Sequence, residues 1–210
     1  MLTVYGDIRS GNCLKVKWLL EWLGRDYRWI ETDVTTGVTR SPQFLALNPA
    51  GQTPTIVLAD ERPLAQSNAI LVHMGEGTAL IPADAYDRAR MFEWLFWEQY
   101  SHEPCIAVVR FQRAIAGRAA EEIDPRLVEK GYAALARMEG GLDGRDWLAG
   151  EAVSLADLAL VAYTRVAHEG DFRPDALRQR QGLGQPGGGG VRHRLRRTNR
   201  FTACARRSNA

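Results

Sequence analysis

The sequence has no long apolar segment and few cysteines. No part of the 210-residue chain holds the roughly 20 consecutive apolar residues that a membrane-spanning helix requires. The opening segment, MLTVYGDIRS, alternates as a strand does and lacks the basic and then apolar pattern of a secretory signal. The three cysteines, Cys13, Cys105 and Cys204, lie far apart without metal-ligand spacing. We therefore expect a cytoplasmic protein in a reducing compartment, with no metal and no membrane contact.

Acidic residues are scarce at one end of the chain and common elsewhere. Residues 173–210 hold ten arginines, no lysine and one acid, a net charge of +9, whereas residues 1–172 carry −7. The 45% hydrophobic content is enough to bury a substantial core, and the length suits two small domains better than one large domain. The composition of residues 173–210 thus differs from that of the rest of the chain.

The first 78 residues alternate between strand and helix patterns. Runs of β-branched and aromatic residues at 2–5 and 27–33 flank a segment, 12–23, with apolar residues at helical spacing. Strands joined in this way run parallel, and their sheet needs helices over it. The remaining expected elements are a short helix opening at Ser41-Pro42, a strand at 55–58, a turn at 60–63 into a brief fourth strand, and a helix with Ser67 as its N-cap.

Strand patterns cease near residue 80, and helical patterns follow. A long helix is expected over 84–118, interrupted at Pro104, and a second over 125–142. Ser154 and Asp157 have the spacing of a capping box and open an apolar helix that should be central. The predicted organisation is an α/β domain at 1–78, an all-helical domain at 84–172 and an Arg/Gly-rich, aberrant or disordered tail at 173–210.

Several short motifs together resemble the glutathione S-transferase family, in its bacterial and theta-like branch with a serine-type active site. This resemblance implies a thioredoxin-like α/β N-terminal domain and an all-α C-terminal helical bundle. It covers some 170 residues of the chain. The motifs are Tyr5 with SGN at 10–12, NPAGQTP at 48–54, QSNAI at 66–70, and WLAG at 147–150 followed by SLAD at 154–157.

The resemblance implies that Ser10 is the catalytic residue. Relatives place a hydroxyl at the mouth of the first helix, where it bonds the glutathione sulfur. A helix N-terminus carries partial positive charge, so a thiolate is favoured there over a thiol. Tyr5 and Cys13 are the other candidates for this sulfur contact, although Cys13 shares a helix face with Val16 and is expected to be a buried, inert thiol. Asn12 either reaches the sulfur or caps the helix.

The resemblance also implies contacts for the rest of glutathione. Thr53-Pro54 resembles the family's cis-proline site, where Thr53 would pair with the cysteinyl part through its backbone. Gln52 and Arg40 are placed where relatives bind the glycyl carboxylate. Ser67 and the helix start behind it suit the γ-glutamyl carboxylate. Gln66 stands where relatives carry an acid for the α-ammonium group, so its neutral amide predicts weaker glutathione binding.

The expected function is transfer of glutathione, as co-substrate, to a small hydrophobic electrophile by a homodimer. Alternatives are a non-catalytic binding or interaction module and a glutathione-dependent peroxidase or disulfide reductase. The helical domain should supply the electrophile pocket, and the aromatic residues there are mostly core or dimer contacts. Candidates on its first long helix are His102 and Arg110, together with Trp94, Trp97, Tyr100 and Phe111.

The tail departs from the family pattern. Its glycine run would destabilise a helix by roughly 1 kcal/mol per residue relative to alanine. An Arg-rich arm could bind nucleic acid or another polyanion, but we favour a reading-frame slip shortly after Phe172. Codons for residues 177–193 can be chosen so that the frame displaced by one base spells FASVRAWVSRVEAESGI, which is typical of the missing family helix.

The slip predicts that the coding DNA differs from that of close relatives by a small insertion or deletion near the codon for Phe172. Restoring the frame should raise the melting temperature, because the missing helices would cover apolar surface. DNA sequencing of independent isolates and thermal melting of both forms test this. An intact frame shared by all isolates, or equal melting temperatures, would contradict it.

Overall fold

The computed structural model describes residues 1–173, which fall into two compact units. The first unit is Met1–Ile81, and the second begins at Pro82. The tail predicted for 173–210 lies outside the described residues, apart from Arg173. Within residues 1–173, no helix combines the length and the apolar character needed to cross a membrane.

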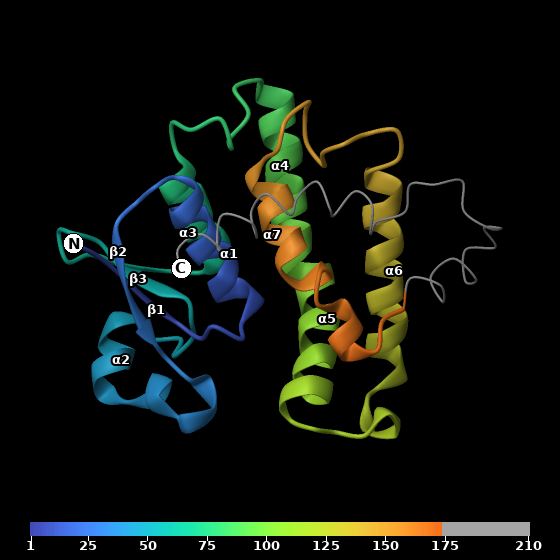
Figure 1. Cartoon of the computed structure of the whole chain (residues 1–210), viewed down its shortest axis with the longest axis horizontal. Coiled ribbons are helices and arrows are strands. Elements are labelled where there is room, and N and C mark those ends of the chain that lie inside the picture. Colours follow the sequence, from blue (N-terminus) through green and yellow to red (C-terminus); the bar gives the residue numbers. More distant parts are fainter. Residues whose placement is uncertain (174–210) are drawn as a thin grey trace, which may run out of the picture. The chain divides into compact units, whose positions relative to one another are not determined.

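The first unit is a four-stranded mixed sheet with helices packed on it (Figure 1). The strand order is β2-β1-β3-β4, with β1 and β2 parallel and the other pairs antiparallel. Helices α1 and α3 pack against each other, and α2 lies apart from them. The elements are β1 (Leu2–Gly6), α1 (Gly11–Trp22), β2 (Tyr27–Glu31), η1 (Val34–Thr36), η2 (Val38–Arg40), α2 (Pro42–Leu47), β3 (Thr55–Val57), β4 (Pro63–Ala65) and α3 (Ser67–Gly75).

The core of the first unit lies between the sheet and its two main helices. Val4 and Ile56 pair across β1 and β3, and both side chains are fully buried. Leu19 on α1 and Ile70 on α3 are also fully buried. This packing fixes the starts of both helices with respect to the central strands, as the alternating sequence pattern predicts.

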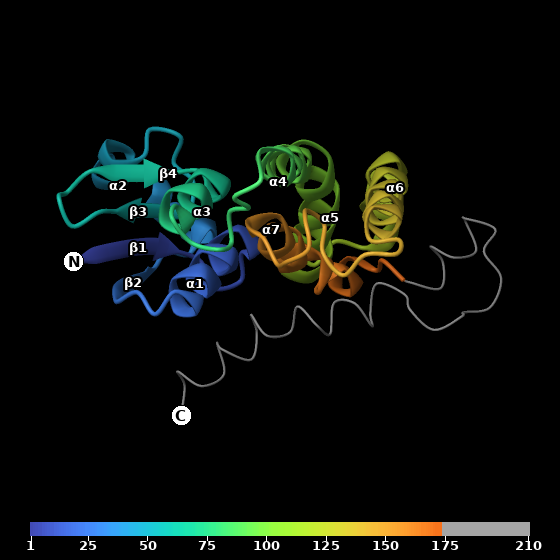
Figure 2. The ribbon, with the colours of Figure 1, turned by 90° about the horizontal axis from the view of Figure 1, so that it is seen from above.

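The second unit is entirely helical in the part that the structure describes (Figures 1 and 2). Helix α7 packs against α4 and α5, and all ten of its residues are buried, which confirms the expectation that it is central. The elements are α4 (Ala85–Trp97), η3 (Glu98–His102), α5 (Glu103–Arg110), η4 (Phe111–Ile115), η5 (Ala120–Glu122), α6 (Pro125–Gly141), α7 (Leu155–Thr164) and η6 (Ala167–Gly170).

The long helix expected over 84–118 is not broken at Pro104. A π-helical turn, η3, joins α4 to α5, and the Glu103 N–H donates to the Glu98 carbonyl five residues earlier. A proline has no N–H and crowds the preceding turn, and a wider turn accommodates it without ending the helix. The chain therefore runs through α4, η3, α5 and η4 without leaving helical geometry.

The capping box predicted at the start of α7 is confirmed. The Asp157 carboxylate accepts hydrogen bonds from the Ser154 N–H and hydroxyl, both at 2.9 Å, and from the Leu148 N–H at 3.0 Å. Burial raises the pKa of Asp157 to about 6, although the three donors act in the opposite direction. The side chain thus ties the loop before α7 to the first turn of the central helix.

Replacing Asp157 by alanine should lower the free energy of unfolding by roughly 3 kcal/mol or more, because two buried N–H groups and a hydroxyl lose their acceptor. The matched control is Glu129→Ala, at an exposed position on α6. Urea denaturation followed by circular dichroism measures both variants. Equal midpoints for the two would show that the box contributes little.

Candidate functional site

Ser10 lies at the mouth of α1, as the sequence predicts. It occupies the N-cap position in an extended conformation, with φ −81° and ψ 123°. Its hydroxyl accepts from the Cys13 N–H at 3.4 Å, and its carbonyl accepts from the Leu14 N–H at 2.9 Å. The first N–H groups of a helix lack partners within the helix. A hydroxyl and a set of N–H donors therefore meet at one point, a geometry suited to a bound anion.

The loop before β3 is tied together by one buried asparagine. The Asn48 amide donates to the Gln52 carbonyl at 2.8 Å and to the Thr55 hydroxyl at 3.1 Å. Thr55 pairs with Tyr5 on β1, so this loop ends beside the strand that leads to Ser10. The peptide bond between Thr53 and Pro54 is cis, which confirms the prediction.

The starts of α1 and α3 are joined by a side-chain hydrogen bond. The Ser67 hydroxyl donates to the Asn12 side-chain oxygen at 3.1 Å, across 55 positions of the sequence. Ser67 was expected to be the N-cap of α3, but Gln66 holds that position, and Ser67 is the first helical residue. Gln66 has a positive φ of 68°, a value uncommon for residues other than glycine. This turn brings Ser67 beside Asn12 and commits its hydroxyl to that residue.

Cys13 is fully buried on α1, as its helix face predicts. Burial raises the pKa of its thiol, and hydrogen bonds with Thr53 and Ser10 only partly oppose this effect. Cys13 is therefore held as a thiol. The same interactions place Thr53 and Ser10 next to one side chain. The structure thus brings together five of the predicted site residues, namely Ser10, Asn12, Cys13, Thr53 and Ser67.

The other candidates of this unit have contacts of their own. The Tyr5 ring packs edge-on against Phe44, with ring centroids 5.9 Å apart. Arg40 is exposed and donates to the Ala50 carbonyl at 3.2 Å. Gln52 is also exposed, although its carbonyl is held by Asn48. Within residues 1–173, no group of three or more His, Cys, Asp or Glu side chains could hold a metal ion.

Comparison with known proteins decides the family. The model of the glutathione S-transferase N-terminal domain matches residues 9–76, and that of the C-terminal domain matches residues 97–182. Glutathione S-transferase 3 of Zea mays is 35% identical over 165 residues, which span 74% of this chain and 73% of the relative. The chain belongs to the glutathione S-transferase family.

A solved structure of a bacterial glutathione S-transferase is similar to most of this chain. The enzyme of Pseudomonas fluorescens Pf-5 has a TM-score of 0.81 at 43% identity, over 86% of this chain and 90% of that one. The disulfide-bond oxidoreductase YfcG of Escherichia coli is 31% identical, over 70% of this chain and 72% of YfcG. The C-terminal domain match ends at residue 182, inside the Arg-rich and Gly-rich segment. The reading-frame slip stays a prediction.

The two electrophile-pocket candidates of this transferase lie in packed surroundings. His102 is fully buried, and its Nε2 lies 2.9 Å from the Thr164 hydroxyl. That hydroxyl donates to the Leu160 carbonyl on α7, so His102 belongs to the packing around the central helix. Arg110 forms an ion pair with Glu169 at 2.7 Å. Both side chains thus join helices of the second unit, and an electrophile contact for them stays a prediction.

Sequence reasoning missed the contacts that join distant segments of this transferase. The bond between Asn12 and Ser67 had no local signal, because both residues also suit their own helix starts. The pair between Arg9 and Asp33 also had no local signal, because the two residues lie 24 positions apart. An Asp-x-Arg sequence at 7–9 was the one available clue, since an acid two positions before an arginine can receive its side chain in a tight loop.

Proposed function

We propose that this glutathione transferase activates its co-substrate at Ser10. The observation that carries the proposal is the position of the Ser10 hydroxyl at the N-terminus of α1. The hydroxyl would donate a hydrogen bond to the glutathione sulfur, and the helix N-terminus would favour its negative charge. Neither contribution requires Ser10 to lose its proton. Glutathione thereby becomes a stronger nucleophile near neutral pH.

Glutathione would extend from Ser10 toward the start of α3. We assign the backbone of Thr53 to its cysteinyl part, paired as an added strand. The γ-glutamyl carboxylate would lie at the backbone N–H of Ser67 and the next N–H groups of α3, where the helix dipole favours an anion. Gln66 would bond the α-ammonium group without charge pairing. Arg40 and Gln52, on the exposed side of the unit, would bind the glycyl carboxylate.

The reaction is attack by the thiolate on a small hydrophobic electrophile. The sulfur forms a bond to an electron-poor carbon, and a leaving group departs with its electron pair or the product takes up a proton from water. Burial keeps Cys13 protonated, so it would not compete with glutathione as the nucleophile. The chain would need no metal for this chemistry, and we place it in the cytoplasm.

Glutathione-dependent disulfide reduction is the second candidate, favoured by the likeness to the E. coli disulfide-bond oxidoreductase. The same thiolate would attack a disulfide sulfur, forming a mixed disulfide and releasing one thiol. A second glutathione thiolate would then release the other thiol as oxidised glutathione forms. Assays with an aryl halide and with a small disulfide separate the two reactions. Glutathione binding without either turnover would indicate a non-catalytic module.

Replacing Ser10 by alanine should lower turnover by roughly 10²-fold, the usual effect of losing one donor to a developing anion, while glutathione binding is retained. The control is Ser41→Ala, because Ser41 caps α2 in the same unit and accepts from the Phe44 N–H at 3.3 Å. Each variant loses about 1 kcal/mol of cap stability. Conjugation assays should find only the Ser10 variant impaired. Wild-type turnover in that variant would refute the role of Ser10.

The homodimer is a further part of this proposal. Aromatic side chains line one face of α4 and η3, where Phe92 and Phe96 stack with centroids 6.2 Å apart. Phe96 is 72% exposed and Tyr100 is 87% exposed. Apolar rings with this exposure are typical of a surface that a partner covers. We propose a second copy of the chain as that partner.

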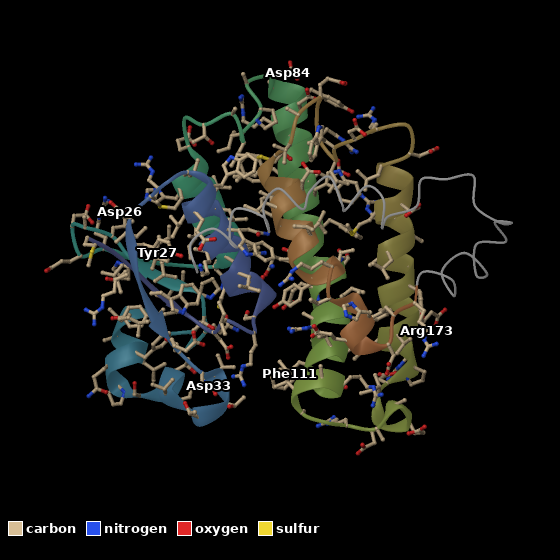
Figure 3. All side chains as sticks on the ribbon, in the orientation of Figure 1. Asp26, Tyr27, Asp33, Asp84, Phe111 and Arg173 are labelled. Atoms are coloured by element: carbon tan, nitrogen blue, oxygen red, sulfur yellow. The ribbon has the colours of Figure 1, made fainter. Side chains whose placement is uncertain are left out.

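Replacing Phe96 by glutamate should weaken dimerisation by at least roughly tenfold, since a charge would enter an apolar interface. Phe111→Glu is the control, because Phe111 is 43% exposed and lies in η4, beyond the other end of α5 (Figure 3). Analytical ultracentrifugation measures the dissociation constants. A monomeric wild type, or a Phe96 variant that dimerises as the wild type does, would exclude this surface.

A further inference from the structure

A buried acid, Asp7, helps to fix the loop that delivers Ser10 to the start of α1, beside a bond from the Ile8 N–H to Glu31 Oε1 at 3.0 Å. Asp7 follows β1 and is 2% exposed. Its carbonyl accepts from the Ser10 N–H at 3.0 Å, so the position of Ser10 depends on that of Asp7. The Asp7 carboxylate in turn accepts from Arg9 three times, from the backbone N–H at 2.9 Å, from Nε at 3.0 Å and from Nη2 at 2.7 Å.

Arg9 also reaches the segment that follows β2. Its Nη2 donates to Asp33 Oδ1 at 2.5 Å, and Asp33 lies two residues beyond the end of that strand (Figure 3). Asp33 is itself held, because it caps η1 by accepting from the Thr35 N–H at 2.8 Å. Arg9 thus connects the loop carrying Ser10 to a fixed point on the neighbouring strand connection.

The electrostatics agree with this arrangement. Burial acts to raise the pKa of Asp7, but the bonds and charge of Arg9, with a hydrogen bond from the Val34 backbone, outweigh it, and the pKa lies below its usual value. Hydrogen bonds from Thr35, with help from Arg9, lower the pKa of Asp33 as well. Both carboxylates are therefore ionised at neutral pH, and the guanidinium bonds both of them.

Two other Asp-x-Arg pairs show what is particular to Arg9. Among the Asp-x-Arg sequences of the chain, Asp60 with Arg62 and Asp124 with Arg126 form the same local ion pair, with side chains that are 40–83% exposed. Exposed pairs of this kind contribute little to stability. Within residues 1–173, Arg9 alone of the three arginines pairs with a second acid, and its first partner is the buried one.

We propose that Arg9 is a positioning residue for the activation of glutathione, which holds Ser10 in place by joining Asp7 to Asp33. The inference rests on the proposed role of Ser10. Arg9 acts on the sulfur through the hydroxyl and the helix start, without bonding the sulfur. Loss of Arg9 lets the segment from Asp7 to Ser10 move, so the donors at the mouth of α1 meet the thiolate less well.

The test is the pKa of the thiol of bound glutathione, titrated by the ultraviolet absorbance of the thiolate. Arg9→Met should raise this pKa by about one unit, a tenfold decrease in the acid dissociation constant of the bound thiol. Arg9→Lys keeps the charge but loses the planar guanidinium, so it should raise the thiol pKa by less than Arg9→Met does. Arg62→Met is the matched control and should leave the pKa unchanged. At a pH well below the thiol pKa, where the bound sulfur keeps its proton, the dissociation constant of glutathione should change less than about twofold in all of them.

Asp33→Asn keeps the test decisive even if loss of Arg9 unfolds the chain. An asparagine can still cap η1, and the buried pair of Asp7 with Arg9 stays intact, so only the charged link to Asp33 is weakened. This variant should raise the thiol pKa by part of the Arg9→Met shift. In a Ser10→Ala background, each change should add a smaller shift than it causes alone, because the part that acts through the Ser10 hydroxyl is already lost.

The outcomes separate this inference from the proposed function. A Ser10→Ala variant with an unchanged thiol pKa would overturn both. A shift in Ser10→Ala, with the wild-type value in folded Arg9→Met or in Asp33→Asn, would overturn only the role of Arg9. Additive shifts from Arg9 and Ser10, or weaker glutathione binding without a pKa shift, would likewise contradict action through Ser10.

Discussion

The site depends on how the chain passes from β1 into α1. A strand that ends at Gly6 is followed by a helix that begins at Gly11, so four residues must reverse the backbone and present Ser10 together with the first N–H groups of the helix. The Asp7 carbonyl and carboxylate hold this short connection from within. A helix N-terminus can stabilise an anion only where its donors are held at a fixed point, and this loop supplies that point.

Other contacts of the first unit hold the remaining segments that would bind glutathione. Asn48 fastens the loop that carries Thr53, and the bond between Ser67 and Asn12 fastens the start of α3 to that of α1. Val4 on β1 and Ile56 on β3 pair and are buried, so the loop after β1 and the loop before β3 lie at the same end of the sheet. Each segment that would contact glutathione is thus positioned by a contact outside the ligand. Rigid support of this kind lowers the entropy lost when the tripeptide binds.

Local chemistry explains which features the sequence could predict. Two helix starts could be predicted from a few neighbouring residues. Ser10 precedes an apolar helical run and is the N-cap of α1, and the spacing of Ser154 and Asp157 gives the capping box of α7. The cis bond before Pro54 was predicted from the resemblance to the family, because no local sequence rule indicates it. The π turn before Pro104 and the N-cap at Gln66 were missed, because the packing of neighbouring elements decides both. The bridge from Arg9 to Asp33 spans 24 positions and leaves no periodic trace in the sequence.

The most direct measurement is a crystal structure of this chain with glutathione bound. The account predicts the sulfur at roughly 3.0–3.5 Å from the Ser10 hydroxyl oxygen, beside the first N–H groups of α1, with Arg9 still paired to Asp7 and Asp33. A sulfur bonded to the Tyr5 hydroxyl, or joined to Cys13 in a mixed disulfide, would contradict it.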